Sequence, residues 1–491
     1  MIHEDADAYR ERKEDFISDL TGTTMLELVL VSTPIPMGMW MLVEAKALLP
    51  GCGKSLPTLG WTGFMLETLA VLFPALASVL WPSLTVTLVL SMAFASACFR
   101  LQRHYRMTGS AGTSPGGEAH QEKDLVSPVM DSVTNIRASI MVMTFITILA
   151  VDFQANDNRS THLVLVLQVF PRRFAKTEVF GTGLMDLGVG ATIFASGLAS
   201  GCRVKSGRLK QGWSVWRTVL ADTASAAIRA WPLAVLGVSR LAVIKGLGYQ
   251  EHVSEYGVHW NFFATLFFMR LVVVPGNRIS PARLRCCIAL VPVLVYQYFL
   301  VRKGLSDFIV HAPRDTLFAM NREGVLGLVG FVAIYYIAEE LGSQISAPHQ
   351  KSKKRERSRF PSRSLAIAAR ASAILWGLTF LSETLIQQTS RRMANLTYVL
   401  WVCAHSMLML SLLMIVDSLS AKRPISQVMA AINLNMFPVF MAANLATGAV
   451  NISMRTLDAE TPTAIAILAI YVVFVAGFAV ALSNRGLAFK M

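Results

Sequence analysis

Charged residues are scarce in this chain, and cysteines are few. Of its 491 residues only 15% are Asp, Glu, Lys or Arg, whereas 54% are hydrophobic and the mean hydropathy is +0.50. A water-soluble protein needs a more highly charged surface, so this composition excludes the soluble class. The six cysteines include no C-x-x-C pair, which excludes a disulfide framework and a thiolate metal site.

Sequence signatures of metal and nucleotide chemistry are also missing. The nine histidines show no H-E-x-x-H spacing, so we expect no metal and no bound cofactor. No G-x-x-x-x-G-K-[ST] loop occurs, which argues against a transporter driven by nucleotide hydrolysis. The first twenty residues are polar and acid-rich, so no cleavable signal is predicted and the first apolar span is expected to act as an anchor.

Long apolar segments, in contrast, occur along the whole sequence. A helix needs about 20 apolar residues to cross roughly 30 Å of hydrocarbon. We therefore predict an all-α polytopic membrane protein, with residues 1–491 forming a single domain of about thirteen transmembrane helices. The predicted spans are 24–45, 61–80, 82–99, 133–152, 181–200, 218–244, 259–276, 284–301, 323–341, 364–386, 394–417, 427–449 and 462–483.

Basic residues collect in the loops on one side of this arrangement. That side includes a Gly/Ser-rich flexible loop at 100–132 and a basic loop at 342–363, which holds the KSKKRERSR run. Positive loops stay in the cytosol, so we predict a cytosolic C-terminus and a lumenal N-terminus. The net charge of +14 is then explained by topology and contact with membrane lipids. No aromatic residues interleave the basic run, so no nucleic-acid partner is expected.

Polar residues able to do chemistry gather at helix ends on the opposite face. Ionisable groups at a membrane boundary are costly to hold there and mark a candidate site. The candidate site residues are Asp152, Arg172, Arg173, Lys176, Asp186, His252, His259, Trp260, Asn261, Phe262, Phe263, Asn321, Arg322, Arg391, Arg392, Asn395 and Asn444.

Several of these segments carry a family resemblance. They are AVDF at 150–153, FPRRFAKTE at 170–178, GTGLMDLGVG at 181–190, RLAVIKGLGYQEHVSEYGVHWNFF at 240–263, NREG at 321–324 and SRRMANL at 390–396. Together they resemble the inositol acyltransferases of glycosylphosphatidylinositol (GPI) anchor synthesis, the PIG-W family, whose fungal members are called GPI-anchored wall transfer proteins. The resemblance runs in order along the chain.

The resemblance implies a multi-pass enzyme of the endoplasmic reticulum membrane with its functional face toward the lumen. Such an enzyme transfers a fatty acyl chain, typically palmitoyl, from acyl-CoA to the inositol hydroxyl of glucosaminyl-phosphatidylinositol. The expected partners are therefore glucosaminyl-phosphatidylinositol, acyl-CoA as co-substrate, and membrane lipids.

Acylation of a hydroxyl by a thioester needs a base for the hydroxyl proton and a positive group where the oxyanion forms. We expect Asp152 to be the base or to orient the hydroxyl, and Lys176 to stabilise the developing charge; the resemblance points to the same two residues. The structural alternative is an ion pair that ties a loop to a helix end. His252 and His259 are second candidates for the base, although a histidine beside an apolar span is more often structural.

The remaining candidates are expected to bind substrate. The pairs Arg172/Arg173 and Arg391/Arg392 suit a phosphodiester or the CoA phosphates, or they anchor the protein at the headgroup layer. Trp260, Phe262 and Phe263 line an acyl tunnel according to the resemblance, whereas their spacing alone equally fits an aromatic belt.

One segment departs from the family pattern. In the family, AVDF runs almost directly into FPRRFAK, but here residues 155–168 intervene. They form either a lumenal insertion, with Asn158 in a glycosylation sequon, or a retained intron, and we favour the second. Two other function classes remain as alternatives, a polytopic transporter and a non-catalytic membrane subunit. A transporter is expected to place charges in mid-membrane on broken helices.

Overall fold

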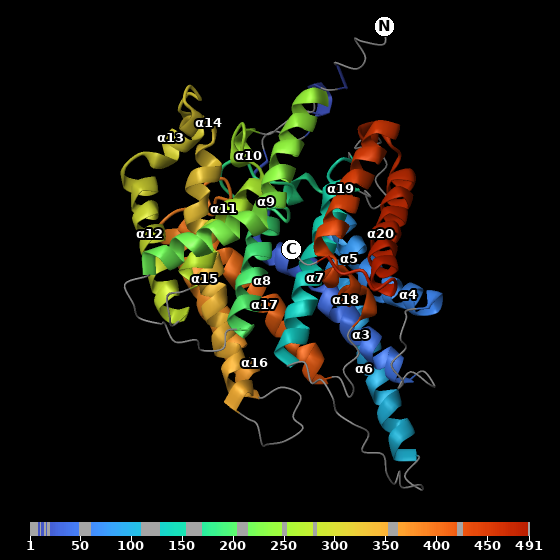
Figure 1. The fold of residues 1–491 in the computed structure, drawn as a ribbon. Coiled ribbons are helices and arrows are strands. Elements are labelled where there is room, and N and C mark those ends of the chain that lie inside the picture. Colours follow the sequence, from blue (N-terminus) through green and yellow to red (C-terminus); the bar gives the residue numbers. More distant parts are fainter. Residues whose placement is uncertain are drawn as a thin grey trace. The chain divides into compact units, whose positions relative to one another are not determined.

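The structure is a computed structural model that describes residues 8–9, 11–13, 16, 20–48, 60–109, 128–153, 169–203, 215–247, 253–277, 282–351, 362–419 and 426–489. Within these ranges every regular element is helical and no strand occurs, which confirms the predicted all-α class (Figure 1). The chain divides into two compact units. The first unit comprises residues 1–23, 173–353 and 366–408, and the second comprises 24–172, 354–365 and 409–491.

Eleven helices in the described part of the chain are long and apolar enough to cross a membrane. They confirm a multi-pass membrane protein, whereas the count of thirteen spans and their orientation stay predictions. The eleven are Met25–Leu48, Trp61–Leu80, Pro82–Arg106, Val129–Ala150, Val219–Ala242, Ala282–Arg302, Arg322–Ala347, Arg363–Leu385, Leu396–Leu419, Met436–Ser453 and Thr461–Asn484.

Three predicted spans differ from the helices observed. The span expected at 181–200 is helix α8 (Leu187–Arg203), because residues 181–186 form a loop that ends at Asp186. The span expected at 259–276 is α11 (Phe262–Gly276), which has 15 residues and begins at the capping residue Asn261. The span expected at 427–449 is divided at Asn435 into α18 (Gln427–Leu434) and α19 (Met436–Ser453).

The first unit is built around α8 and α15 (Arg322–Lys351), which pack along each other (Figure 1). Gly197 and Gly201 on α8, and Gly342 on α15, let the two backbones approach so closely that a Cβ atom at these positions would meet backbone atoms of the other helix. Small residues of this spacing are typical of helix pairs in membranes. Helix α15 continues to Lys351, so the predicted loop at 342–363 begins with helical residues.

The first unit also contains other helices. They are α9 (Val215–Leu247), α10 (Val253–Tyr256), α11, α12 (Ala282–Arg302), α13 (Leu305–His311), α14 (Leu317–Met320) and α16 (Ser362–Leu385). Helix α17 (Leu396–Leu419) begins in the first unit and ends in the second. Helix α11 packs against both α9 and α15.

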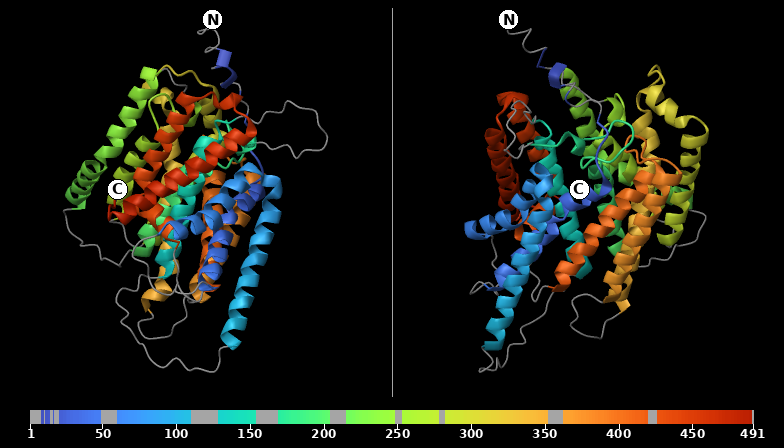
Figure 2. Two further views of the ribbon diagram at one scale, coloured as in Figure 1. Left: turned by 90° about the vertical axis from the view of Figure 1, so that its right-hand side faces the viewer. Right: turned by 180° about the vertical axis from the view of Figure 1, so that it is seen from behind.

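The second unit holds the N-terminal and C-terminal helices. They are α2 (Met25–Ser32), α3 (Pro34–Leu48), α4 (Trp61–Glu67), the π-helix η1 (Thr68–Leu72), α5 (Phe73–Leu80), the 3-10 turn η2 (Pro82–Leu84), α6 (Thr85–Gly109), α7 (Pro128–Ala150), α18, α19, the 3-10 turn η4 (Thr456–Asp458) and α20 (Thr461–Asn484). Helices α3 and α6 lie side by side (Figure 2), and α7 packs against α18, α19 and α20. Helix α6 extends to Gly109 and α7 starts at Pro128, so the loop predicted at 100–132 is shorter than expected.

Candidate functional site

Two loops of the first unit that lie far apart in the sequence are joined by hydrogen bonds. One comprises residues 173–186 and the other residues 386–395. The Gly181 N–H donates to the Thr389 carbonyl at 2.8 Å, and the Ser390 hydroxyl donates to the Val179 carbonyl at 2.5 Å. Gly181 has φ +120°, a left-handed conformation that favours glycine. At Gly181 the glycine-rich segment therefore forms a turn whose backbone contacts the other loop.

The Asp186 side chain closes the first of these loops. Its Oδ2 atom accepts hydrogen bonds from the Gly183 N–H (2.8 Å), the Thr177 hydroxyl (3.0 Å) and the Thr177 N–H (3.2 Å). The carboxylate is buried, and its Oδ1 atom has no hydrogen-bond partner. Burial raises the pKa of Asp186 to about 6, although Arg391 and the N–H donors act in the opposite direction. Such a carboxylate changes its charge near neutral pH.

Arg391 connects Asp186 to the helix α10. Its Nε lies 3.9 Å from Asp186 Oδ1, and its Nη2 lies 3.6 Å from Glu255 Oε2. The guanidinium stands over the Tyr256 ring, 5.0 Å from the centroid, an arrangement that favours arginine over lysine. The Arg391 side chain is only 5% exposed, so this cation is largely shielded from water.

Lys176 completes this group, because its amine forms an ion pair with Glu255. The pKa of Lys176 is lowered overall, mainly because burial removes surrounding water. Glu255 acts to raise this pKa, whereas Arg391 and Arg240 lower it further. We name this group the Arg391 cluster; its members are Lys176, Asp186, Glu255, Tyr256 and Arg391. It contains two cations and two carboxylates, so its formal charges balance at neutral pH.

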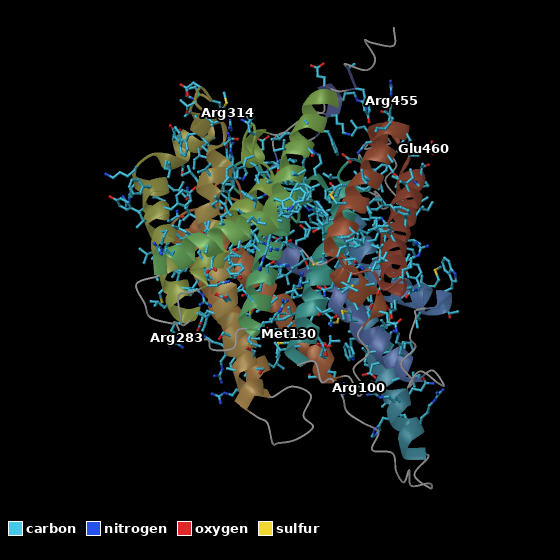
Figure 3. The ribbon with its side chains drawn as sticks, in the orientation of Figure 1. Arg100, Met130, Arg283, Arg314, Arg455 and Glu460 are labelled. Carbon is cyan, nitrogen blue, oxygen red and sulfur yellow. The ribbon has the colours of Figure 1, made fainter. Side chains whose placement is uncertain are left out.

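A second charged group surrounds Glu323, whose side chain is fully buried. Arg314, in the loop between α13 and α14, donates to both carboxylate oxygens at 2.5 and 3.1 Å (Figure 3). Arg392 donates to Oε1 at 3.1 Å. The neighbouring Arg322 stacks on Phe308 and donates its Nε–H to the Ile309 carbonyl at 2.9 Å. Arg391 and Arg392 thus serve different carboxylates.

Asp152, the predicted base, lies in the second unit, at the end of α7. Its Oδ2 accepts a hydrogen bond of 2.7 Å from the Asn451 amide on α19. The Thr456 hydroxyl donates to the Asn451 Oδ1 at 3.3 Å, and this contact fixes which way the amide faces. Asp152 and Lys176 belong to different units, so the predicted pair of these two residues stays a prediction.

The predicted substrate-binding residues of the 259–263 segment contact their own helix and the neighbouring helices of the first unit. The His259 N–H donates to Asn321 Oδ1 at 2.8 Å, and the His259 ring is exposed. The Trp260 indole donates to Thr265 at 2.9 Å and stacks on Phe268. Asn261 caps α11 by accepting from the Ala264 N–H at 3.1 Å, and its own amide donates to the Gly237 carbonyl at 2.9 Å. Phe262 and Phe263 form the first turn of α11, and Phe263 is buried.

The other predicted residues are spread over the molecule. Asn395 caps α17, accepting hydrogen bonds from the Ser390 and Tyr398 N–H groups at 3.2 and 3.0 Å. Asn444 on α19 donates to the Phe440 carbonyl at 2.7 Å. Arg172 and Arg173 are exposed on the 3-10 turn η3 (Arg172–Phe174). His252 and the segment 155–168 lie outside the described residues.

Charged side chains that contact one another can stabilise charge and exchange protons. Among the described residues, no group of three or more His, Cys, Asp or Glu could hold a metal ion. A balanced set of buried charges can instead hold a lysine in a fixed place, where it stabilises a developing anion. A carboxylate oriented by an amide can accept a proton.

Sequence reasoning did not select Glu255, Tyr256, Glu323 or Asn451 as site residues. Glu255 and Tyr256 lie within the long segment at 240–263 that carries the resemblance, but nothing in their spacing shows their partners. Asn451 follows Asn444 by seven residues, which places both near one face of a helix. That spacing was the signal available for Asn451.

These features define a multi-pass α-helical membrane protein with two groups of ion-paired side chains at helix ends and in loops. The sequence model of the GWT1 family matches residues 9–482, and the chain belongs to that family. The GPI-anchored wall transfer protein 1 of Aspergillus oryzae is 32% identical to it, with 98% of this chain and 99% of that protein covered. The protein of the same name from Saccharomyces cerevisiae is 30% identical over 98% of this chain and 99% of its own length. That of Eremothecium gossypii is 31% identical over 96% and 97%.

Proposed function

We propose that this protein is the inositol acyltransferase of GPI-anchor biosynthesis. It transfers a fatty acyl chain, typically palmitoyl, from acyl-CoA to the inositol hydroxyl of glucosaminyl-phosphatidylinositol in the endoplasmic reticulum membrane. The observation that carries this proposal is membership of the GWT1 family over nearly the whole chain. It is supported by eleven apolar helices among the described residues, which suit two lipid substrates, and by the ionisable groups in the loops at their ends.

In the proposed reaction the inositol hydroxyl attacks the thioester carbonyl of acyl-CoA. Asp152 accepts the hydroxyl proton, and Lys176 stabilises the negative charge on the tetrahedral oxyanion. The C–S bond then breaks, the CoA thiolate leaves and takes up a proton, and the ester remains on the inositol. The hydrogen bond from Asn451 to Asp152 supports an oriented base, and the ion pair of Lys176 with Glu255 supports a held cation.

The test is acyl transfer from labelled palmitoyl-CoA to glucosaminyl-phosphatidylinositol, in membranes that contain the full chain. We expect a labelled, inositol-acylated lipid from the wild type and none above background from Asp152→Asn or Lys176→Ala. Each removed group is expected to contribute about 10²–10⁴-fold to the rate. A second form lacking residues 155–168 shows whether that segment belongs to the working enzyme.

The matched controls are conservative changes outside the Arg391 cluster and outside the charged group around Glu323. Ser453→Ala on α19 removes an exposed hydroxyl that bonds only the Val450 carbonyl one turn back. Glu460→Gln removes an exposed carboxylate at the start of α20 (Figure 3). Both are expected to match the wild type. No transfer by a well-expressed wild type, with or without residues 155–168, would refute the proposed function.

A further inference from the structure

Glu255 stands between two cations of the first unit. One of its carboxylate oxygens pairs with the Lys176 amine, and the other lies 3.6 Å from Arg391 Nη2. Its side chain is 20% exposed. A carboxylate has two oxygens and about four lone-pair sites, so one Glu can bridge two donors that come from different loops.

Arg391 is held in turn by two further groups of the first unit. It lies on the Tyr256 ring and near the buried Asp186 Oδ1. Asp186 is itself fixed through Oδ2 by three donors of its own loop. Lys176 therefore contacts Glu255, Glu255 contacts Arg391, and Arg391 contacts Asp186. These contacts connect the Lys176 side chain, which is 36% exposed, to the fully buried Asp186 side chain.

We propose that Glu255 is a positioning residue of the acyl-transfer site, whose carboxylate fixes the Lys176 amine by bridging it to the anchored Arg391. This inference rests on the proposed function for the role of Lys176. It adds a residue that acts on the reaction through the lysine rather than by touching the substrate.

The physical reason is the freedom of a lysine side chain. Its flexible four-carbon stem gives the amine many positions, and a mobile cation is a poor partner for an oxyanion that forms at one place. A carboxylate held at a fixed point removes much of that freedom. An ammonium has three N–H donors, and the contact with Glu255 uses one of them.

The bridge also favours the charged form of the lysine, although burial lowers the pKa of Lys176 overall. The charged groups that act on Lys176 are Glu255 on α10, Arg391 in the 386–395 loop and Arg240 on α9. Glu255 is the one anion among them, and it raises the pKa of Lys176 while both arginines lower it. Replacing Glu255 with a neutral residue leaves two cations beside the amine, so the amine loses its proton at a lower pH.

The first experiment measures the titration of Lys176 without using the reaction. The full-length protein in detergent is labelled with limiting acetic anhydride across the alkaline range, and acetylation of the Lys176 peptide is quantified by mass spectrometry. We expect the labelling midpoint of Glu255→Gln to lie at lower pH than that of the wild type. Glu255→Asp, which keeps the charge, is expected to stay near the wild type, as is the control Glu460→Gln.

The second experiment follows acyl transfer by the same proteins against pH. We expect Glu255→Gln to lower kcat by at least about tenfold, to leave KM for palmitoyl-CoA near that of the wild type, and to move the alkaline limb of the profile to lower pH. Glu255→Asp has one methylene less, so its limb stays in place while kcat falls by a smaller factor. If Glu255→Gln does not fold, the limb and kcat of Glu255→Asp provide the comparison.

The outcomes separate the two proposals. If the wild type transfers no acyl chain, the proposed function fails, and the labelling midpoint still decides whether Glu255 controls Lys176. If the wild type is active but Glu255→Gln keeps the labelling midpoint, the alkaline limb and kcat of the wild type, the positioning role is refuted. An equal loss of activity in Glu255→Asp and Glu255→Gln, with no shift of the limb, would also overturn it.

Discussion

The Asn451 amide donates a 2.7 Å hydrogen bond to the carboxylate of Asp152, although 298 residues separate the two in the intervening chain. Asp152 lies just after α7, which ends at Ala150. Asn451 lies near the end of α19, and α19 packs against α7. The Thr456 hydroxyl bonds the other end of the same amide. Asn451 thus orients the proposed base Asp152, and Thr456 in turn orients Asn451.

Replacement of Asn451 by Ala tests this orientation. The change removes a hydrogen bond to a charged group, an interaction of about 1.5–3 kcal/mol. We expect kcat for acyl transfer to fall about 10–100-fold, with little change in melting temperature because Asn451 is partly exposed. Ser453→Ala on the same helix is the control. Wild-type kcat in a well-folded Asn451→Ala protein would show that Asp152 does not need this contact.

Glu67 is expected to stabilise the second unit. This fully buried carboxylate pairs with Lys46 at 2.5 Å and accepts from the Ser426 hydroxyl at 2.6 Å and the Val428 N–H at 2.8 Å, at the start of α18. Removing one partner of a buried pair costs about 3–5 kcal/mol. We expect Glu67→Gln to lower the melting temperature in detergent clearly, whereas Glu460→Gln does not. Equal melting temperatures for the two variants would contradict this prediction.

Asn261 is expected to act through the stability of α11 rather than through substrate binding. Its side chain accepts from the Ala264 N–H and donates to the Gly237 carbonyl on α9. Loss of an N-cap side chain costs about 1 kcal/mol, so Asn261→Ala lowers the melting temperature while KM for both substrates stays unchanged. Asn261→Ser keeps a capping acceptor and loses the bond to Gly237 without adding a charge, so its effect is smaller. A raised KM at an unchanged melting temperature would return Asn261 to the substrate site.

The helical class and eleven spans could be predicted because hydropathy over about 20 residues is a local property of the sequence. The division of the predicted span 427–449 was visible in part, since Pro438 sits in the first turn of α19, where proline is favoured. The break also depends on distant contacts. The Asn435 side chain bonds the Leu487 carbonyl and the Phe489 N–H, and no local pattern shows these partners.

The candidate site was predictable in composition but not in pairing. Asp186, Lys176 and Arg391 stand out in the sequence because charges are expensive among apolar helices. Their partners depend on how loops meet in the fold. Lys176 pairs with Glu255, 79 residues away, and Arg391 reaches Asp186 from the 386–395 loop. Adjacent arginines look like one anion-binding pair in sequence, yet Arg392 turns to Glu323.

Asp186 is expected to make stability depend on pH in the mildly acidic range. Its pKa is raised from 3.8 to about 6 by burial, so the folded protein holds this proton more tightly than the unfolded chain does. The stabilisation is therefore fully present below the unfolded value of 3.8 and is lost as pH rises through about 6. Because the unfolded chain binds fewer protons in this window, the slope of stability against pH is negative there.

The measurement is the melting temperature in detergent across this window, for the wild type and for Asp186→Asn, which keeps the shape and removes the titration. We expect the melting temperature of the wild type, relative to that of Asp186→Asn, to decrease as pH rises toward 6, because only the wild type must then hold a buried carboxylate charge whose Oδ1 atom accepts no hydrogen bond. Glu460→Gln controls for the loss of one exposed carboxylate. A constant difference between wild type and Asp186→Asn at every pH would mean that Asp186 does not titrate in this window, and would contradict the prediction.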